Sequence, residues 1–316
     1  QQTGLTANIA PRVVALGGGR TYDGGTAVAA GNLTIANNVD SANLTLSGNA
    51  VLAGRNVGTQ TITSPAFSTY AAPTRVQFAT GNTGSSATTI SVNMGTAPAN
   101  GNTLIAIIAT RGTSSGRVSS IAQTGAAWSR ASQSVGTGGT TTEIWYAPNV
   151  QGAAAAVSIT QANLRSAAVV IEYAGVLTAG ALDQVANATG NSATASTGTT
   201  PMTIQTSELW VGGIGLVSSN YTLAVSGTPA FSTVASAQST NGTSTLNAKV
   251  YALEYVAGAT GTASSGGAVS TSSQRSGAMA TFKAAINPGT LALGGPAAKN
   301  YTLVGASGAV AVAQTN

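Results

Sequence analysis

The sequence contains no cysteine and no histidine. The absence of cysteine excludes disulfide bonds, zinc–thiolate sites and cysteine nucleophiles. The absence of histidine removes the Ser-His-Asp triad, the most frequent general base and the most frequent ligand of catalytic zinc. The commonest routes to hydrolytic and metal-dependent catalysis are therefore closed to this chain.

Charge is also scarce, because Asp, Glu, Lys and Arg make up only 6% of the 316 residues, against about 25% in ordinary globular chains. The net charge of +5 comes from twelve scattered basic residues that form no patch, so we expect no nucleic-acid binding. No apolar run approaches the ~20 residues of a membrane helix, and we expect no membrane insertion. A neutral surface of Thr, Ser, Asn and Gly predicts an extracellular or cell-surface protein.

Short apolar segments recur along the whole chain, and Gly, Asn, Ser and Pro separate them. Some alternate with polar residues, as in TTISVNM (88–94), and others are wholly apolar, as in NTLIAIIAT (102–110). The two best helical candidates, residues 152–162 and 165–175, carry β-branched and aromatic residues that favour strands. The pattern predicts an all-β protein with antiparallel, sandwich-type domains.

Composition divides the chain into three parts. Proline-containing stretches at residues 64–74 and 284–300 flank a middle block that holds all three tryptophans. The two flanks resemble each other more than either resembles the middle. We therefore predict a split domain (residues 1–70 plus 285–316), into which a second β-sandwich domain (residues 73–284) is inserted.

The flanks carry a recognisable motif series. RTYDGGTAV (20–28), ANLTLSGNAVLAGRNVGTQTIT (42–63) and LALGGPAAKNYTLV (291–304) together resemble the YDG repeat of large secreted bacterial adhesins of the filamentous-haemagglutinin kind. Two features depart from that repeat. The middle block interrupts it, and GLTANIAPR (4–12), which should follow NYTL, stands at the front of the chain.

The middle block carries a second series of segments, GNTLIAIIATRG, VSSIAQTGAAWSRASQS, TEIWYAPNVQG, AAVVIEYAGV, ALDQVANATG, SELWVGGIG and GAMATFKA. Together these segments resemble a jelly-roll-like β-sandwich module of bacterial and phage surface proteins. That resemblance implies a fold and a surface location but no activity, because a fold does not specify a function.

The displaced GLTANIAPR motif suggests an assembly hypothesis. Either the chain is one unit of a longer tandem polypeptide, or its N-terminal strand (residues 4–14) completes the sheet of another copy. The leading hypothesis is a structural subunit of an extracellular bacterial filament or stalk, joined head to tail by donor-strand exchange. The expected interface comprises the strand residues Leu5, Ala7, Ile9 and Val13, and a groove partly lined by Tyr301, Leu303, Val310 and Val312.

The alternative hypothesis is an adhesin module that binds surface glycans through exposed aromatic side chains. Trp145 and Trp210 lie in strand-like IWY and LWV segments, so we expect them to be buried. Trp128, in GAAWSR, lies near a predicted turn and is the better candidate for contact with a glycan.

An enzyme is the third possibility, and the seven acidic residues give it little support. We expect Asp23 in TYDGG to cap a turn, with Gly24 or Gly25 at positive φ. A glycosidase needs two carboxylates about 5–10 Å apart, but for the acids on predicted strands, Glu143, Glu172 and Glu254, strand-end salt bridges are the simpler account. Asp23 is also a candidate catalytic acid or calcium ligand, and Asp183, with backbone carbonyls, is a candidate ligand of a single calcium ion. The GGG at residues 17–19 lacks the lysine and helix of a phosphate loop, so we expect a flexible connector. We predict no enzymatic activity, no bound metal and no cofactor.

Overall fold

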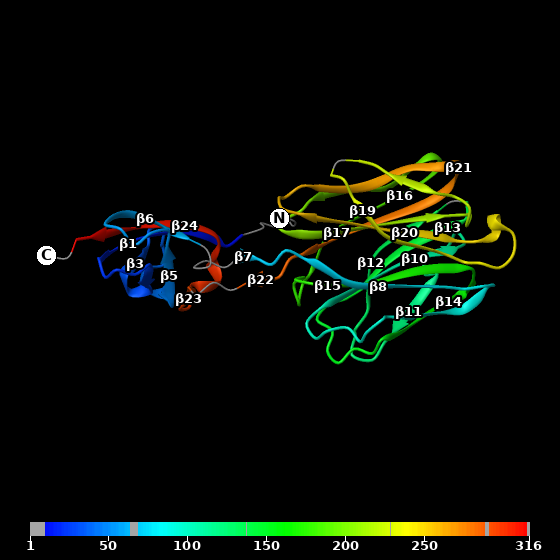
Figure 1. Cartoon of the computed structure of the whole chain (residues 1–316). Coiled ribbons are helices and arrows are strands. Elements are labelled where there is room, and N and C mark those ends of the chain that lie inside the picture. Colours follow the sequence, from blue (N-terminus) through cyan, green and yellow to red (C-terminus); the bar gives the residue numbers. More distant parts are fainter. Residues whose placement is uncertain (1–9, 64–68, 137, 228, 288–290, 315–316) are drawn as a thin grey trace, which may run out of the picture. The chain divides into compact units, whose positions relative to one another are not determined.

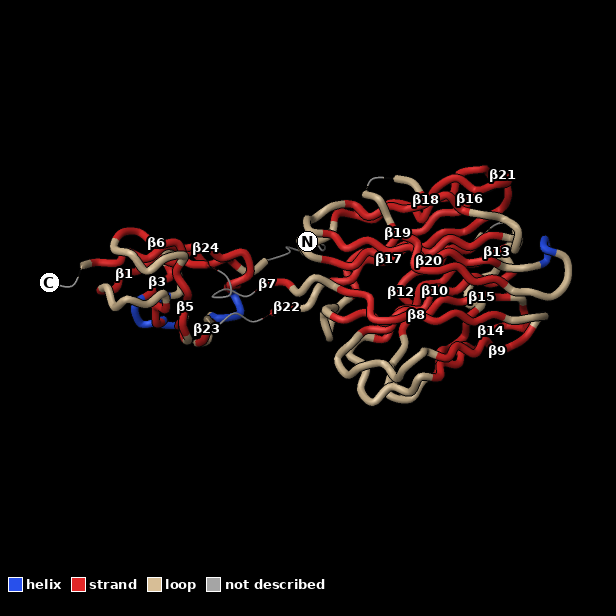
Figure 2. Tube along the Cα trace, viewed as in Figure 1, coloured by secondary structure: helices blue, strands red, loops and turns tan. Residues whose placement is uncertain are grey.

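The computed structural model describes residues 10–63, 69–136, 138–227, 229–287 and 291–314. Strands make up 62% of the chain, and the described residues form no α-helix, only single turns of 3-10 helix (Figures 1 and 2). No described helix is thus long and apolar enough to cross a membrane. The prediction of an all-β, sandwich-type protein is confirmed. Among the described residues, every strand pair is antiparallel except one, which is described below.

The chain folds as two compact units, here called unit 1 (residues 1–70 and 286–316) and unit 2 (residues 71–285). The chain passes from unit 1 into unit 2 after β7 and returns at β22. These two short strands pair with each other, Tyr70 opposite Ile286. The two passages therefore lie side by side, which is the usual geometry of an inserted domain.

Unit 1 is built on a six-stranded sheet with the order β2-β5-β6-β24-β1-β3. Two small pairs, β4 with β23 and β7 with β22, accompany it, together with the 3-10 turns η1 (Ala30–Asn32), η2 (Ser41–Asn43) and η4 (Ala298–Asn300). The strands are β1 (Arg12–Thr21), β2 (Ala27–Ala29), β3 (Leu33–Ile35), β4 (Thr45–Ser47), β5 (Asn49–Leu52), β6 (Gly58–Thr63), β7 (Thr69–Tyr70), β22 (Ile286–Asn287), β23 (Ala292–Gly294) and β24 (Tyr301–Ala313).

The two longest strands of this sheet, β1 and β24, are neighbours and run parallel from Arg12↔Tyr301 to Thr21↔Ala313. Val14 and Val310 are completely buried here, in a core that draws on nearly every strand of the unit. The antiparallel prediction does not hold for this pair. Parallel pairing needs a long connection, and unit 2 lies within that connection.

The expectation of a flexible connector at residues 17–19 is wrong, because these glycines lie inside β1. Their small size permits close packing. A Cβ on Gly18 would lie 2.2 Å from the carbonyl oxygen of Asn32. The missing side chain thus lets β1 approach the neighbouring backbone, as glycine in a strand often does.

Unit 2 is a stack of three sheets. It also contains η3 (Ser244–Leu246). Its strands are β8 (Thr74–Asn82), β9 (Ala87–Asn93), β10 (Thr103–Arg111), β11 (Val118–Ala122), β12 (Ser129–Val135), β13 (Thr140–Ala147), β14 (Ala156–Leu164), β15 (Ser166–Ala174), β16 (Leu182–Met202), β17 (Glu208–Leu216), β18 (Leu223–Val225), β19 (Ser232–Gln238), β20 (Lys249–Ala257) and β21 (Thr262–Lys283).

The middle layer is the five-stranded sheet β12-β13-β10-β15-β8. One of its faces packs against the sheet β11-β14-β9, where Leu104 meets Ile159 in one core cluster. The other face packs against the sheet β16-β21-β17-β20-β19, where Ile105 and Leu209 share a second cluster. Strands β10 and β15 are therefore covered on both faces, which explains why their sequences are almost continuously apolar.

A fourth layer comes from the long strands β16 and β21, whose paired distal halves double back over the outer face of their own sheet. Ala195 and Ala263 from these halves share a core cluster with Trp210 and Met279 of the sheet beneath. The overlap is close, because a Cβ on Gly277 would lie 2.1 Å from the carbonyl oxygen of Ser196.

We expect Gly277→Ala to destabilise unit 2, because the added methyl group would push the doubled-back strands away from the sheet. Overpacking of this kind costs about 1–3 kcal/mol, and each kcal/mol lowers Tm by about 2–4 °C in a domain of this size. Calorimetry of the two proteins measures this difference.

Gly258→Ala is the matched control, because a Cβ at Gly258 meets no atom within 4 Å. Equal Tm values for the two alanine variants would contradict the doubled-back arrangement.

Candidate functional site

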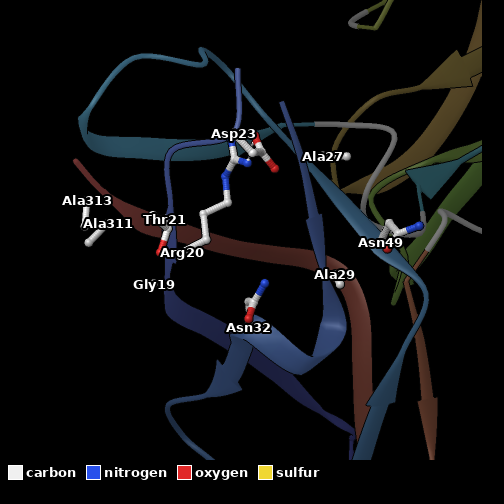
Figure 3. Close-up of a pocket in the computed structure, with 10 residues that line it drawn as sticks. All are labelled: Gly19, Arg20, Thr21, Asp23, Ala27, Ala29, Asn32, Asn49, Ala311 and Ala313. Atoms are coloured by element: carbon white, nitrogen blue, oxygen red, sulfur yellow. Dashed lines mark hydrogen bonds and ion pairs between the residues drawn. The ribbon is translucent and has the colours of Figure 1, made fainter. Parts of the chain in front are cut away.

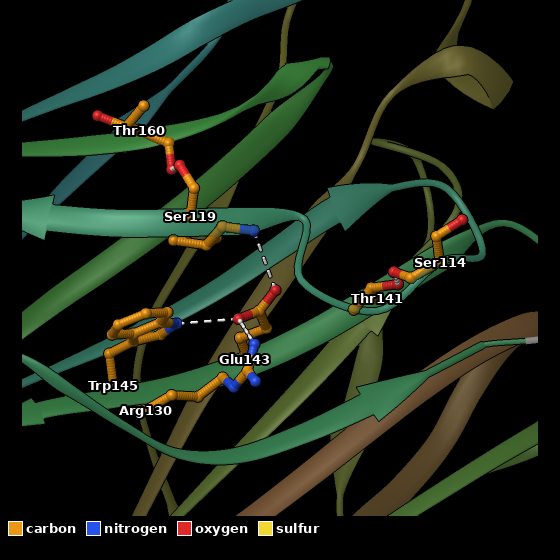
Figure 4. A network of polar contacts seen from close by, with 8 residues as sticks. Ser114, Ser119, Arg130, Thr141, Glu143, Trp145 and Thr160 are labelled. Carbon is orange, nitrogen blue, oxygen red and sulfur yellow. Dashed lines mark hydrogen bonds and ion pairs between the residues drawn. The ribbon is translucent and has the colours of Figure 1, made fainter.

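Glu143 lies at the centre of a buried polar network in unit 2 (Figure 4). Its Oε1 accepts a hydrogen bond from the backbone N–H of Val118 at 3.1 Å. Its Oε2 accepts one from Nε1 of Trp145 at 3.0 Å and lies 3.5 Å from Nη1 of Arg130. The salt bridge expected for Glu143 is present, and donors engage both oxygens.

Glu172 is held differently, by amide groups alone. Oε1 accepts hydrogen bonds from Ala99 N (2.8 Å) and Asn102 Nδ2 (2.6 Å), and Oε2 accepts one from Gln77 Nε2 (2.6 Å). No described Arg or Lys side chain forms an ion pair with it, so the expected salt bridge is wrong for this residue. Neutral donors replace the cation because β8 and the loop before β10 meet at this point of the sheet.

Glu254 forms the expected salt bridge, with Arg75 at 2.7 Å. Its other oxygen accepts a hydrogen bond from the Tyr173 hydroxyl at 2.7 Å, which links β20 to β15. Burial, and then the negative charge of Glu254, raise the pKa of Tyr173 well above its usual value. The three strand-borne acids therefore join neighbouring strands, and each has its own set of donors.

Sequence reasoning did not single out Glu208, which is the most perturbed acid of the chain. It is fully buried, and neither carboxylate oxygen has a hydrogen-bond donor among the described residues. Burial, and then the neighbouring carboxyl group of Asp183, raise its pKa from 4.5 to about 8. Glu208 is therefore protonated at neutral pH.

A β-bulge in β16 places Asp183 beside Glu208. The register between β16 and β21 shifts at this point, and the N–H of Gln184 bonds to Thr281 Oγ1 at 3.0 Å. The Asp183 Oδ2 accepts a hydrogen bond from the N–H of Ile204 at 2.9 Å. Among the described residues, no three His, Cys, Asp or Glu side chains gather as a metal site.

The tryptophans follow the predicted burial. Trp145 and Trp210 are 8% and 4% exposed. Trp128, the candidate for contact with a glycan, is half-buried against the core of unit 2, and its Nε1 donates to Gln123 Oε1 at 3.1 Å. This side chain therefore presents only part of its ring to solvent.

In unit 1, the predicted turn at Asp23 is confirmed. The Asp23 Oδ1 accepts a hydrogen bond from the N–H of Gly25 at 2.8 Å, and Gly24 has a φ of +78°. That hydrogen bond and the neighbouring Arg20 guanidinium hold the pKa of Asp23 below its usual value. Arg20 itself is buried and also donates to the carbonyl of Gly25.

The residues expected at a subunit interface fall into two groups. Leu5, Ala7 and Ile9 lie outside the described residues. Val13 is 45% exposed on β1, which already pairs with β24 of the same chain. The expected groove residues, Tyr301, Leu303, Val310 and Val312, are all buried in the core of unit 1. In this conformation they leave no opening for an incoming strand.

An open hollow of about 860 Å³ lies instead at the end of the sheet where β1 and β24 terminate (Figure 3). Gly19, Thr21, Ala311 and Ala313 line one side of it. Strand β2 lines another side with Ala27 and Ala29. Because most lining side chains are small, the hollow exposes backbone, which is what an added peptide strand requires.

No protein-family model matches the chain, and no curated protein matches it.

We expect the stability of unit 2 to depend on the proton that Glu208 holds. Since the folded state binds this proton with a pKa of about 8 against the usual 4.5, the free energy of unfolding falls as pH rises through that interval. Glu208→Gln keeps a neutral side chain and removes this loss. Above pH 8 the variant should be more stable by ~1 kcal/mol or more, measured as Tm between pH 4 and pH 9.

Glu172→Gln is the control, and we expect it to lower Tm rather than raise it. The NH₂ group of the new glutamine would face the N–H donors that now bind the Glu172 carboxylate, which costs about 1–3 kcal/mol of stability at neutral pH. Parallel Tm curves for wild type and Glu208→Gln would show that Glu208 is ionised in the folded protein.

Proposed function

We propose that the protein is a structural subunit of an extracellular filament or stalk, in which copies join head to tail by exchange of a terminal strand. The observation that supports this is the parallel pairing of β1 with β24. The chain runs into unit 1 at the Arg12–Tyr301 end of this pair and runs out at the Thr21–Ala313 end. The thirteen residues of β24 span about 40 Å at ~3.3 Å per residue.

This direction of the chain suits a linear array. A unit whose incoming and outgoing segments lie at opposite ends of one sheet can follow another such unit without a reversal of the chain. A contact between unlike ends that does not close into a ring generates a filament. The same geometry serves a tandem polypeptide or separate subunits, and we propose the latter.

The inserted unit 2 is compatible with such an array. Because β7 and β22 pair with each other, the chain leaves and rejoins unit 1 at one place. The sheet of unit 1 is thereby continuous across the insertion. The resemblance of the flanks to adhesin repeats, and of unit 2 to a surface module, supports an extracellular location.

The acids of unit 2 support a structural role over an enzymatic one. Glu143, Glu172 and Glu254 each bind donors from neighbouring strands. Each carboxylate thus has a stabilising function, and none has both oxygens available for a substrate.

The test is negative-stain microscopy and light scattering of the whole chain and of a chain lacking residues 1–11. This truncation ends before β1, which begins at Arg12, so the described fold of unit 1 is retained. We expect filaments from the whole chain and monodisperse particles from the truncated one, because the truncated chain has no strand to donate.

A matched pair of full-length variants separates the effect of the sequence of the N-terminal segment from the effect of shortening the chain. Leu5→Ser with Ile9→Ser removes the apolar positions of the alternating segment and should abolish filaments. Thr6→Ser with Asn8→Ser changes only the polar positions and should not. Monodisperse particles from the unmodified chain would overturn the proposal.

A further inference from the structure

We infer that the open edge of β2, with the hollow beside it, is the acceptor site for residues 5–9 of a second copy of this chain. The inference rests on the proposed function and names the surface that accepts the donated strand.

The backbone of β2 offers hydrogen bonds on its outer edge. Ala30 N bonds to Gly48 O at 2.9 Å and Leu52 N to Thr26 O at 2.8 Å. In an antiparallel ladder this register turns the N–H and C=O groups of Ala27 and Ala29 away from β5. These groups bond to no other backbone group among the described residues, so a further strand can pair with them.

The hollow gives that strand room for its side chains. The walls opposite β2 are glycine and alanine of β1 and β24, as Figure 3 shows for Gly19 and Ala311. Buried Arg20 borders the hollow, and its Nε lacks a partner among the described residues. A peptide carbonyl placed there would satisfy it, since a buried unpaired donor costs about 1–3 kcal/mol.

At the opposite end of the sheet, where β1 begins, the edge of β1 cannot pair with an added strand. Beyond the short strand β3, the side chain of Asn37 covers the outer edge of β1. Its Nδ2 donates to Val13 O at 2.8 Å, and its Oδ1 accepts from Ala15 N at 2.9 Å. No comparable side chain caps Ala27 or Ala29 within the described part of unit 1. The open edge is therefore confined to the Ala313 end.

The occupant must come from another copy because of reach. Residues 5–9 are joined to β1 through Ala10, at the Arg12 end. Ile9 is three residues from Arg12 and can lie at most ~11 Å from it, whereas the hollow begins at Gly19, about 23 Å along β1 from Arg12. The segment LTANI alternates apolar and polar residues, as an edge strand with one buried face requires.

Disulfide trapping tests the acceptor site, because the chain contains no cysteine. Ile9→Cys is introduced into one preparation and Ala29→Cys into another, and the two are mixed and oxidised. We expect covalent dimers in at least tenfold excess over a mixture in which Ala42→Cys replaces Ala29→Cys. Ala42 is equally exposed but lies in η2, away from the hollow.

The outcomes separate the inference from the proposed function. Filaments of the unmodified chain with equal trapping at positions 29 and 42 would overturn the acceptor site and leave the filament intact. If the unmodified chain forms no filaments and the mixture of Ile9→Cys with Ala29→Cys forms no covalent dimers, both are overturned. Trapping specific to position 29 supports both.

A second variant keeps the test decisive if the cysteine perturbs folding. Ala27→Pro removes an N–H that β5 does not use, and proline is tolerated at such an edge position. We expect this chain to fold with an unchanged Tm, to donate its own strand and to accept none, so it should cap growing filaments and shorten them. Filaments of normal length in its presence would overturn the acceptor site.

Discussion

Unit 1 depends on the pairing of β1 with β24. These are the two longest strands of its sheet, and they supply several of its most buried side chains, among them Val14 and Val310. Every other strand of that sheet is joined to this pair on one side or the other. Its parallel direction also determines that the chain enters and leaves at opposite ends, and this is the geometric basis of the proposed assembly.

Unit 2 is stabilised in another way, by burial of whole sheets on both faces. Its acidic side chains are therefore each paired with donors or protonated, because a buried charge must be paired or neutralised. Glu143 and Glu254 meet arginines, Glu172 meets amides, and Glu208 retains a proton. The charge of these four carboxyl groups is thus compensated in three ways: by an arginine, by amide donors or by protonation.

The strands were predictable from the sequence, because alternation and apolar runs report directly on burial. The site was not. In the sequence Glu208 resembles any other acid at the start of a strand, and its pKa is raised by two tertiary features, its burial and the bulge that brings Asp183 beside it. The glycines at residues 17–19 suggested a loop because local preference cannot register the close approach of Asn32. The acceptor edge depends on Ala27 and Ala29. Nothing in the sequence around them indicates that their backbone N–H and C=O groups have no partner strand.

The insertion of unit 2 between the paired strands β1 and β24 of unit 1 sets an order of folding. During synthesis β24 emerges only after β1 and the whole of unit 2, so the sheet of unit 1 cannot be completed until unit 2 has been made. Domains generally fold as units, and a folded unit 2 holds Tyr70 beside Ile286. Folding of the insert therefore replaces a very long loop by a short one and lowers the entropic cost of bringing β24 to β1. On this view unit 2 acts as an internal folding aid for the domain that surrounds it.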